Sequence, residues 1–541
     1  MQFASFDLRD PVFACFGHAV SVQIATLENL YGLAPEATRV RAEGERVSLR
    51  CERLAWAGQE ERAEGGAELD VLRGRDGSLR VRARVRAAGR VRCVKILLRG
   101  LESDASIAAP EQTAQAPGRW GCLLAYPGQI PAPVVGIRSG AASLGVRVED
   151  PLLRPKRFAL HVEHFGPLAG RGVAEVICEE DATRFGPDFE TPELVIEPGG
   201  TAEASLAGYL RFAEERLGLA PWAERADVPA WARRIELVTT LHGMHFSGRV
   251  FLGYAEMLEV LRFVAARVPG EAVLAYLPGW EGRYYWQYGD HRPDPRLGGE
   301  AGFARLCDGA RALGIRLMPM FGANCANLRH PAIARLPAAA FLKSATGNRF
   351  HGNQPDWDLA RAHDTGWQGW FNPGHPAWRA HLASQIRRCC REFGLDAVFL
   401  DTVQAWTNDP DHPVLDGLAA LVGELRREIP DLLVAGEADY DRLLPLFPLF
   451  QRPWWQAPPR WTSRYVRRFG HLCEGEPGGR TGVHELGVFA PPDGAAPDAS
   501  FIETLAFQDG TLERHREAVE ATLRRVAERV SRPDPTTAPP R

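Results

Sequence analysis

The sequence predicts a multidomain β plus α/β protein, in which an N-terminal antiparallel β-sandwich is followed by a (β/α)8 TIM barrel. Short strand-like runs separated by Gly, Pro and Asp occupy roughly the first 200 residues, which is typical of a sandwich. Beyond about residue 225, strand and helix patterns alternate, and this order builds a parallel sheet. The chain has 541 residues, which is too long for one hydrophobic core, so two or three domains are expected.

The clearest strand of the predicted sandwich covers residues 79–86. Apolar residues alternate there with four arginines, after the turn pair Asp76-Gly77. One face is therefore expected to be buried and the other solvated, and we interpret the arginines as the solvated face rather than as a polyanion site. Similar short runs occur at residues 91–98, 134–148, 158–164, 173–178 and 194–196.

The sequence divides into three regions. We predict a β-sandwich domain with a linker helix over residues 1–225, a (β/α)8 catalytic barrel over 226–530, and a disordered tail over 531–541. The linker helix is expected around residues 204–217, after the Pro-Gly-Gly turn that ends the sandwich. The tail is rich in proline, and its composition is typical of a disordered segment.

Apolar runs predict the barrel strands, and apolar residues at helical spacing predict the helices between them. The first five strands are expected at residues 235–241, 273–278, 316–321, 396–401 and 432–437, with helices at 254–268, 303–313, 378–393 and 415–429. Weaker patterns indicate strands near Tyr465 and Val483, a last strand at 501–507 and a closing helix at 519–530. An open doubly wound sheet is the alternative, but no Gly-x-Gly-x-x-Gly nucleotide motif follows the first strand.

The fourth and fifth predicted strands each end in a carboxylate, Asp401 and Glu437. A strand, helix, strand unit with a right-handed crossover makes these strands parallel neighbours, so both carboxylates are expected at the C-terminal rim of the barrel. Such a pair can cleave a glycosidic bond: Asp401 attacks the anomeric carbon while Glu437 protonates the leaving oxygen. We expect the carboxyl groups about 5–6 Å apart, as in retaining enzymes. Asp439 and Asp441 are close enough in sequence to share the acid/base role.

Other polar and aromatic residues follow the strand ends and are candidates for binding a sugar. The loop after the second strand, residues 279–291, is rich in aromatic residues, and Trp280 and Asp290 are its best candidates. The alternative for this loop is that it folds onto its own small hydrophobic cluster. The remaining substrate-binding candidates are His242, Asn324, Gln404, Trp406, Asp439 and Asp509, the last of which also suits a turn in Gln508-Asp509-Gly510.

Composition argues against several other classes of protein. A net charge of -4 and a sequence pI near 6.5 give no reason to expect nucleic acid or an anionic membrane as a partner. The N-terminus lacks the basic start of a signal peptide, and no apolar run is long enough to span a membrane. The ten cysteines show no metal-ligand spacing, and His242 and His245 lack the His-x-His spacing of a metal-dependent hydrolase. We therefore expect a cytoplasmic protein with no cofactor and no metal.

Several motifs together resemble a known group of enzymes. The run Asp396-Ala-Val-Phe-Leu-Asp401, the later Ala-Gly-Glu437, and a sandwich in front are similar to retaining glycoside hydrolases of the alpha-amylase clan and its relatives. The resemblance is closest to endo-alpha-N-acetylgalactosaminidase-like and alpha-galactosidase-like barrels. It implies an aspartate nucleophile after strand four and a glutamate acid/base after strand five, at Asp401 and Glu437. In the alpha-galactosidase-like barrels, however, the acid follows the sixth strand.

The sequence therefore predicts a retaining glycoside hydrolase, a glycosidase that cleaves O-glycosidic bonds through a covalent glycosyl-enzyme intermediate. We expect these bonds to be α-linked. The expected partner is an oligosaccharide or glycoside substrate. Two alternatives remain open: a non-catalytic carbohydrate-binding barrel protein, and a metal-dependent TIM-barrel hydrolase. The sugar, the linkage and the oligomeric state do not follow from the sequence.

Overall fold

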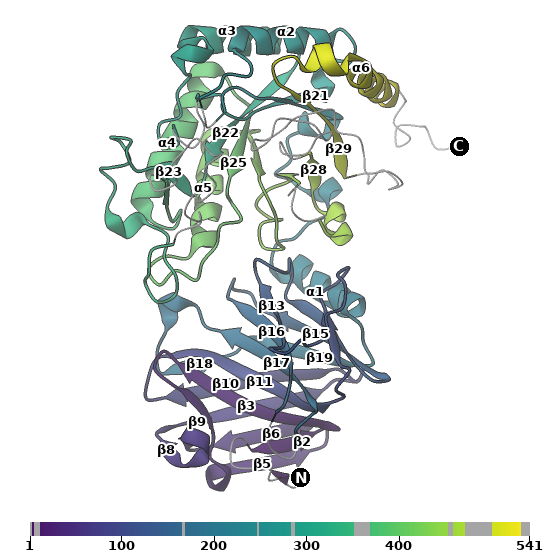
Figure 1. The fold of residues 1–541 in the computed structure, drawn as a ribbon, viewed down its shortest axis with the longest axis vertical. Helices are drawn as coiled ribbons and strands as arrows, with labels where there is room; N and C mark the ends of the chain where they lie inside the picture. Colours follow the sequence, from purple (N-terminus) through teal and green to yellow (C-terminus); the bar gives the residue numbers. More distant parts are fainter. Residues whose placement is uncertain are drawn as a thin grey trace. The chain divides into compact units, whose positions relative to one another are not determined.

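The computed structural model describes residues 3–4, 11–164, 168–245, 248–282, 287–350, 368–452, 458–470 and 500–531. The strand predicted near Val483 and the tail from residue 532 onward lie outside the described residues. Within the described part the chain forms two units, shown in Figure 1 in purple to blue and in teal to yellow. The predicted fold class, an antiparallel sandwich followed by a (β/α)8 barrel, is confirmed.

Each unit is built from more than one stretch of chain. The first comprises Met1–Leu219 together with two short segments, Asn408–Asp411 and Tyr440–Arg442. The second comprises Ala220–Thr407, His412–Asp439 and Leu443–Arg541. The main division therefore falls between Leu219 and Ala220. No pattern in the sequence indicates that two segments from the barrel half of the chain group with the sandwich.

The first unit contains two antiparallel sheets. In the described residues one sheet has the order β13-β16-β17-β11-β3-β4-β7-β8, with β2 also on β3 and β1 on β2. Its strands are β1 (Phe3–Ala4), β2 (Val12–Cys15), β3 (His18–Thr26), β4 (Leu30–Leu33), β7 (Leu54–Trp56), β8 (Glu61–Ala63), β11 (Val91–Leu101), β13 (Cys122–Tyr126), β16 (Lys156–Val162) and β17 (Gly172–Glu179). Apolar residues from both sheets form one buried cluster, which is the core of this unit.

The other sheet has the order β12-β14-β15-β19-β10-β9-β6-β5, with β18 also on β10. Its strands are β5 (Thr38–Glu43), β6 (Arg46–Cys51), β9 (Gly65–Arg73), β10 (Leu79–Ala87), β12 (Ser106–Ala108), β14 (Val134–Ser139), β15 (Ala142–Glu149), β18 (Asp188–Glu190) and β19 (Glu193–Pro198). Burial alternates strictly along β10, as its sequence predicts. Its outward arginines form ion pairs with Glu193, Glu190 and Asp188, which supports their interpretation as a solvated face. The helix α1 (Ala202–Arg216) packs on β14 and β15.

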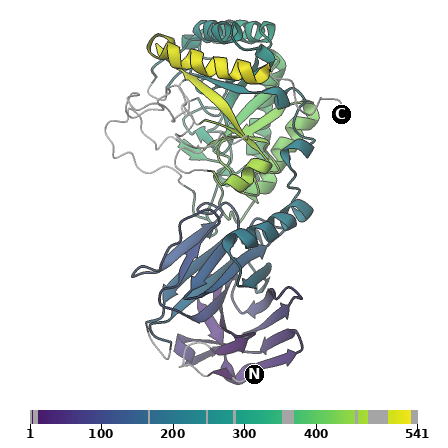
Figure 2. The same ribbon diagram turned by 90° about the vertical axis from the view of Figure 1, so that its right-hand side faces the viewer.

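The second unit is a closed barrel whose strands are all parallel in the described residues. Its strands are β20 (Leu237–Leu241), β21 (Val273–Leu277), β22 (Arg316–Gly322), β25 (Ala397–Asp401), β26 (Leu433–Gly436), β27 (Leu449–Gln451), β28 (Arg467–Phe469) and β29 (Phe501–Phe507). Its helices are α2 (Tyr254–Ala265), α3 (Gly299–Ala312), α4 (Pro376–Phe393), α5 (Val414–Glu428) and α6 (Thr511–Val530). A two-stranded antiparallel sheet pairs β23 (Cys325–Asn327), which follows β22, with β24 (Gln368–Trp370). Figure 2 shows the yellow helix α6 beside β29 on the outside of the barrel.

Helix α4 sets the position of β25, the strand that ends at Asp401. It begins with Pro376 after His375, whose side chain accepts a hydrogen bond from the backbone amide of Ala377. It ends at Gly394, which takes the left-handed conformation with φ 64° that favours glycine. Its buried face includes Trp378, whose indole nitrogen donates to the carbonyl of Ala323, 2.9 Å away. The helix is thereby fixed to the chain just beyond β22, the neighbour of β25.

Candidate active site

Asp401 and Glu437 lie side by side at the ends of two neighbouring barrel strands. β25 and β26 run parallel, with Leu400 opposite Gly436. Asp401 follows Leu400 and Glu437 follows Gly436, so the two carboxyl groups leave adjacent strands at the same level. A hydrogen bond joins their side chains. The nearest oxygens of the two carboxyl groups are therefore within hydrogen-bonding distance. The separation of about 5–6 Å expected between the two groups stays a prediction.

The carboxylate of Glu437 is oriented by the loop that follows Asp401. The backbone amide of Thr402 donates to Oε2 of Glu437 at 3.0 Å, and the side-chain amide of Gln404 donates to the same oxygen at 2.8 Å. Two donors on one oxygen fix the plane of the carboxyl group. Gln404, predicted as a substrate-binding residue, therefore contacts the candidate acid/base directly.

Thr402 holds a backbone conformation that is rare for its residue type. Its φ is 63°, in the left-handed region that β-branched residues seldom adopt. Such a conformation costs on the order of 1–3 kcal/mol and is found mainly at functional sites. Its hydroxyl donates to the carbonyl of Asp401 at 2.6 Å, which holds the turn together. The turn points the Thr402 amide at Glu437, and no feature of the sequence indicated this role.

Tyr288 is a residue of the site that no pattern in the sequence distinguishes. Its hydroxyl donates to Oδ2 of Asp401 at 3.0 Å, and its side chain is fully buried. Gly322, at the end of β22, makes room for the ring, because a Cβ there would lie 2.4 Å from Cδ2 of Tyr288. The aromatic character of residues 279–291 was the available signal, but it did not distinguish Tyr288 from its neighbours.

The environment of Asp401 disfavours its ionised form. Burial raises the pKa of Asp401 well above its usual range, and the negative charge of Glu437 raises it further. The hydrogen bond from Tyr288 acts in the opposite direction. The pair therefore retains a proton at a pH at which an exposed aspartate is ionised. One proton shared between two carboxyl groups is the state that a nucleophile and an acid require.

A second buried acid lies near this pair. The carboxyl group of Glu281 is 3.6 Å from Nδ1 of His291, both side chains are fully buried, and neither has a hydrogen-bond partner among the described residues. Burial raises the pKa of Glu281 to about 8 and lowers the pKa of His291 to about 3. Both groups are therefore neutral near pH 7. The His291 ring packs on Phe321 and Tyr288, with centroid distances of 4.8 Å and 5.4 Å.

Trp280 lies in the core rather than on the rim. Its side chain is fully buried, its indole nitrogen donates to the carbonyl of Met320 at 2.8 Å, and its ring stacks on Phe303 at 4.9 Å. No face of the ring is open to a sugar in this structure. The alternative, a loop folded onto its own hydrophobic cluster, describes Trp280 better, because an aromatic pattern does not by itself reveal which rings are buried.

Three predicted binding carboxylates have arginine partners. The partners are Arg292 for Asp290 at 3.0 Å, Arg468 for Asp439, and Arg249 for Asp509 at 2.6 Å. The ion pair of Asp439 is buried, whereas those of Asp290 and Asp509 are partly exposed. The carboxylate of Asp439 is thus occupied by a buried ion pair within the protein. Binding of a sugar by Asp290 or Asp509 stays a prediction, and it would require each carboxylate to keep or exchange its arginine.

The remaining candidates occupy three different environments. His242 is fully buried beside Phe251. Burial, and to a smaller extent the neighbouring His245, lowers the pKa of His242 to about 3, so its ring is neutral. Asn324 is buried, and its side-chain amide donates to the carbonyl of Ala405 at 2.9 Å, on the loop after Asp401. Trp406, on the same loop, is half-buried against the barrel core. Their contacts with a substrate stay predictions.

Glu437, Asp439 and Asp441 have three different sets of partners. Glu437 meets Asp401, and Asp439 meets Arg468. Asp441 belongs to the first unit, where its carboxylate accepts hydrogen bonds from the hydroxyls of Tyr126 and Tyr209. The idea that Asp439 or Asp441 shares the acid/base role is therefore disfavoured, and Glu437 is left as the candidate.

Two searches of the described residues bear on other classes of site. None of the helices in those ranges is long and apolar enough to cross a membrane. The described side chains also contain no group of three or more His, Cys, Asp or Glu residues placed to hold a metal ion.

Comparison with known proteins gives a match in structure but not in sequence. No family model matches the chain, and no curated protein sequence matches it. The ligand-free alpha-N-acetylgalactosaminidase NagBb from Bifidobacterium bifidum is similar in structure, with a TM-score of 0.63 and 14% identity over 97% of this chain and 92% of that one. Its complex with GalNAc gives a TM-score of 0.59 at 14% identity, over 86% of this chain and 78% of that one.

A second similar structure is the GH36 alpha-galactosidase AgaA from Geobacillus stearothermophilus. It has a TM-score of 0.51 and 13% identity over 94% of this chain and 75% of that one. At identities this low, the structural similarity shows a shared fold and nothing more. The resemblance predicted from the motifs is thus confirmed as a likeness in fold to alpha-N-acetylgalactosaminidase and alpha-galactosidase structures.

Proposed function

We propose that this protein is a retaining glycoside hydrolase that cleaves α-linked sugars, with Asp401 as nucleophile and Glu437 as acid/base. The observation that carries the proposal is the hydrogen-bonded pair of carboxyl groups at the ends of β25 and β26. Its fold is shared with structures of an alpha-N-acetylgalactosaminidase and an alpha-galactosidase. On that basis we propose a terminal galactose or N-acetylgalactosamine unit as the sugar.

The hydrogen bonds at the pair assign a role to each oxygen. Oε2 of Glu437 already accepts from Thr402 and Gln404, so the proton that Glu437 transfers belongs on Oε1. Oδ2 of Asp401 accepts from Tyr288, so Oδ1 is the oxygen that attacks the anomeric carbon. Three donors, from Thr402, Gln404 and Tyr288, thereby hold one acid and one nucleophile in fixed orientations.

The reaction proceeds in two steps. Oδ1 of Asp401 forms an ester with the anomeric carbon while the bond to the leaving oxygen breaks and Glu437 gives that oxygen its proton. Glu437, now ionised, takes a proton from water, and the resulting hydroxide opens the ester with overall retention of configuration. Asp401 must be ionised to attack. The shared proton of the resting pair therefore has to reside on Glu437 when substrate is bound.

Hydrolysis of 4-nitrophenyl α-galactoside and 4-nitrophenyl α-N-acetylgalactosaminide tests this proposal. Asp401→Asn is expected to abolish turnover while substrate binding is kept, because the amide has the shape of the nucleophile without its charge. Asp396→Asn is the matched control, since Asp396 lies at the opposite end of β25 in an exposed ion pair with Arg316. It is expected to leave turnover unchanged.

Trapping gives a second readout. A 2-deoxy-2-fluoro-α-galactosyl fluoride is expected to leave a covalent sugar on the peptide that contains Asp401, detected by mass spectrometry. A wild-type protein that binds these glycosides but hydrolyses none of them would support the alternative of a carbohydrate-binding barrel. Activity that disappears with a chelator would instead support a metal-dependent hydrolase.

We also propose a cytoplasmic location and a role in carbohydrate metabolism. The nine cysteines in the described part of the chain are free thiols, which suits a reducing compartment. Fractionation of cells that express the untagged protein tests this location.

A further inference from the structure

Two loops that begin at the proposed catalytic residues continue into the first unit. The chain runs from Asp401 through residues 402–407 to the segment Asn408–Asp411, which groups with the sandwich. It also runs from Glu437 through residues 438–439 to the segment Tyr440–Arg442, which groups with the sandwich as well. Each proposed catalytic residue is thus followed, within seven residues or fewer, by a segment held in the other unit.

Asn408 is held by three hydrogen bonds of its side-chain amide. Its amide nitrogen donates to the carbonyl of Glu180 at 2.8 Å and to Oε1 of Glu179 at 3.2 Å. Its amide oxygen accepts from the backbone nitrogen of Ala182 at 2.9 Å. Because three bonds run to one short stretch of chain, both the position and the orientation of the Asn408 side chain are fixed.

Asp441 is held by two buried tyrosines and by its own backbone. Tyr126 donates to Oδ1 at 2.7 Å, and Tyr209 donates to Oδ2. The backbone amide of Asp441 donates to the carbonyl of Pro131 at 2.8 Å. The next residue, Arg442, donates to the carbonyls of Asp150 and Pro151 at 3.4 Å and 3.1 Å. A carboxylate with a phenol on each oxygen is a strong and specific contact.

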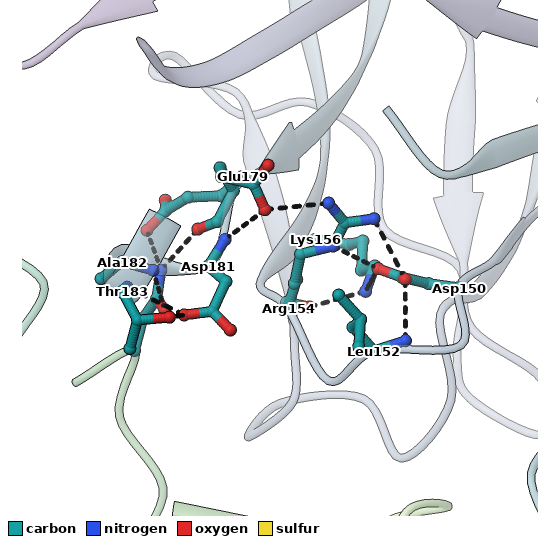
Figure 3. A network of polar contacts seen from close by, with 10 residues as sticks. Asp150, Leu152, Arg154, Lys156, Glu179, Asp181, Ala182 and Thr183 are labelled. Atoms are coloured by element: carbon teal, nitrogen blue, oxygen red, sulfur yellow. Dashed lines mark hydrogen bonds and ion pairs between the residues drawn. The ribbon is translucent and has the colours of Figure 1, made fainter. Parts of the chain in front are cut away.

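The two attachment points share one polar network, shown in Figure 3. Asp150 accepts from the ammonium of Lys156 at 2.6 Å and from Nε of Arg154 at 2.9 Å. Arg154 also donates to Oε1 of Glu180 at 3.0 Å. The carbonyl of Glu180 holds Asn408, and the carbonyl of Asp150 holds Arg442. All the charged members are buried and paired, so the network is rigid.

We propose that this network, together with Tyr126 and Tyr209, anchors the loops that carry the catalytic pair, which makes Asn408 and Asp441 positioning residues. The inference rests on the proposed function, since it concerns the site at Asp401 and Glu437. It gives the sandwich a role that no other observation assigns. When one end of a short loop is held in place, the residues at its other end have little freedom to move. A misplacement of a catalytic group by about 1 Å can lower a rate by on the order of 100-fold.

The test compares two substrates that differ in their need for the acid. A 4-nitrophenyl or methylumbelliferyl glycoside needs protonation by Glu437 more than a 2,4-dinitrophenyl glycoside, whose leaving group departs as a stable anion. Asp441→Asn and the double variant Tyr126→Phe with Tyr209→Phe are expected to lower kcat/KM on the first substrate by about 10-fold to 100-fold. They are expected to lower kcat/KM on the dinitrophenyl glycoside by less than about 3-fold, because kcat/KM reports only the step in which Asp401 attacks, and that step does not need the acid when the leaving group is a stable anion.

Asn408→Ala is expected to behave differently. Its loop carries Thr402 and Gln404 directly after the nucleophile, so kcat/KM is expected to fall on both substrates. The matched control is Thr191→Val, which removes a buried hydroxyl of the same unit that accepts from the amide of Ala83 at 3.0 Å. This control destabilises the sandwich without touching either segment, and its leaving-group dependence is expected to equal that of the wild-type protein.

Hydrogen exchange separates this inference from the proposed function. Peptides that cover residues 397–407 and 433–439 are expected to exchange faster in the Asp441 and Asn408 variants than in Thr191→Val, whether or not the protein hydrolyses the chosen sugars. If those peptides exchange as in the control, the anchor does not exist. If exchange increases but the leaving-group dependence stays constant, the anchor does not position the acid. An inactive wild-type protein with faster exchange in the variants would refute the proposed function alone.

Discussion

Glu281 illustrates what burial does to a single side chain near the proposed site. It lies against His291 without a hydrogen-bond partner in the described structure, and burial raises its pKa to about 8 from the ordinary 4.5. A group with a raised pKa binds protons more tightly in the folded state. The contribution of Glu281 to the free energy of unfolding is therefore fully present below about pH 4.5 and is lost as the pH rises through about 8.

Glu281→Gln is expected to remove this loss. The neutral amide copies the protonated acid, so the stability of the variant relative to wild type should increase between pH 4.5 and pH 8 and then level off. The gain is a few kcal/mol at most, since one pKa unit corresponds to about 1.4 kcal/mol. Urea unfolding at a series of pH values measures it. A constant difference across this range would show that Glu281 does not titrate there.

The two carboxylates of the site could be predicted from the sequence, whereas their partners could not. Asp401 and Glu437 each end an apolar run, and that position alone places them on the rim of a barrel. Tyr288 is 113 residues from Asp401, and its contact depends on the missing Cβ of Gly322. The aromatic loop predicts Trp280 on the rim, but its ring is buried by contacts with α3 and β22 together.

At the scale of elements, prediction succeeded where the hydrophobic pattern was long. The strands β20, β21, β22, β25 and β26 and the helices between them lie within a few residues of the expected positions. β27 and β28 have three residues each, which is too short for a period to emerge. The sequence therefore indicated the first half of the barrel and its last strand more clearly than the part between them.

The end of β22 is an element boundary at which one atom is expected to matter. In Gly322→Ala the new Cβ would lie 2.4 Å from the Tyr288 ring and 2.7 Å from the carbonyl of Cys325, so the ring must move and its bond to Asp401 is lost. We expect kcat to fall by on the order of 10-fold to 100-fold. Steady-state kinetics on the 4-nitrophenyl glycosides measures the change.

Gly423→Ala is the matched control for this substitution. Gly423 lies within α5, and a Cβ there has only the side chain of Arg427 nearby, at 3.8 Å. The change is expected to stabilise the helix by roughly 0.5–1 kcal/mol and to leave kcat unaltered. Equal kinetics for the two alanine variants would show that Tyr288 does not need its present position.

At the scale of the whole molecule, the sequence predicts a sandwich and a barrel. It does not predict that two segments from the barrel half of the chain belong to the first unit. Asn408 and Asp441 lie among polar and proline residues that read as ordinary loops. Their partners in the sandwich are between 226 and 315 residues away in sequence. Contacts of that range leave no local pattern, and they are revealed only by the fold.

Interleaved chains are expected to make the two units unfold together. A ligand that binds at Asp401 and Glu437 stabilises the folded state by about 2.7 kcal/mol at 100 times its Kd. Segments from the same loops belong to the first unit. We therefore expect a single calorimetric transition, whose midpoint temperature the ligand raises. Scanning calorimetry with and without a non-hydrolysed galactose analogue measures it. Two transitions, of which the ligand shifts only one, would show that the units are independent.

The division of the first unit among three stretches of chain also affects its synthesis. Tyr126 and Tyr209 leave the ribosome 315 and 232 residues before their acceptor, Asp441. At about 5–20 residues per second, the shorter of these gaps lasts roughly 10–50 s. The first unit is therefore synthesised first but cannot be completed first. The hydroxyls of its two tyrosines have no Asp441 carboxylate to bind until five strands of the barrel have also been synthesised.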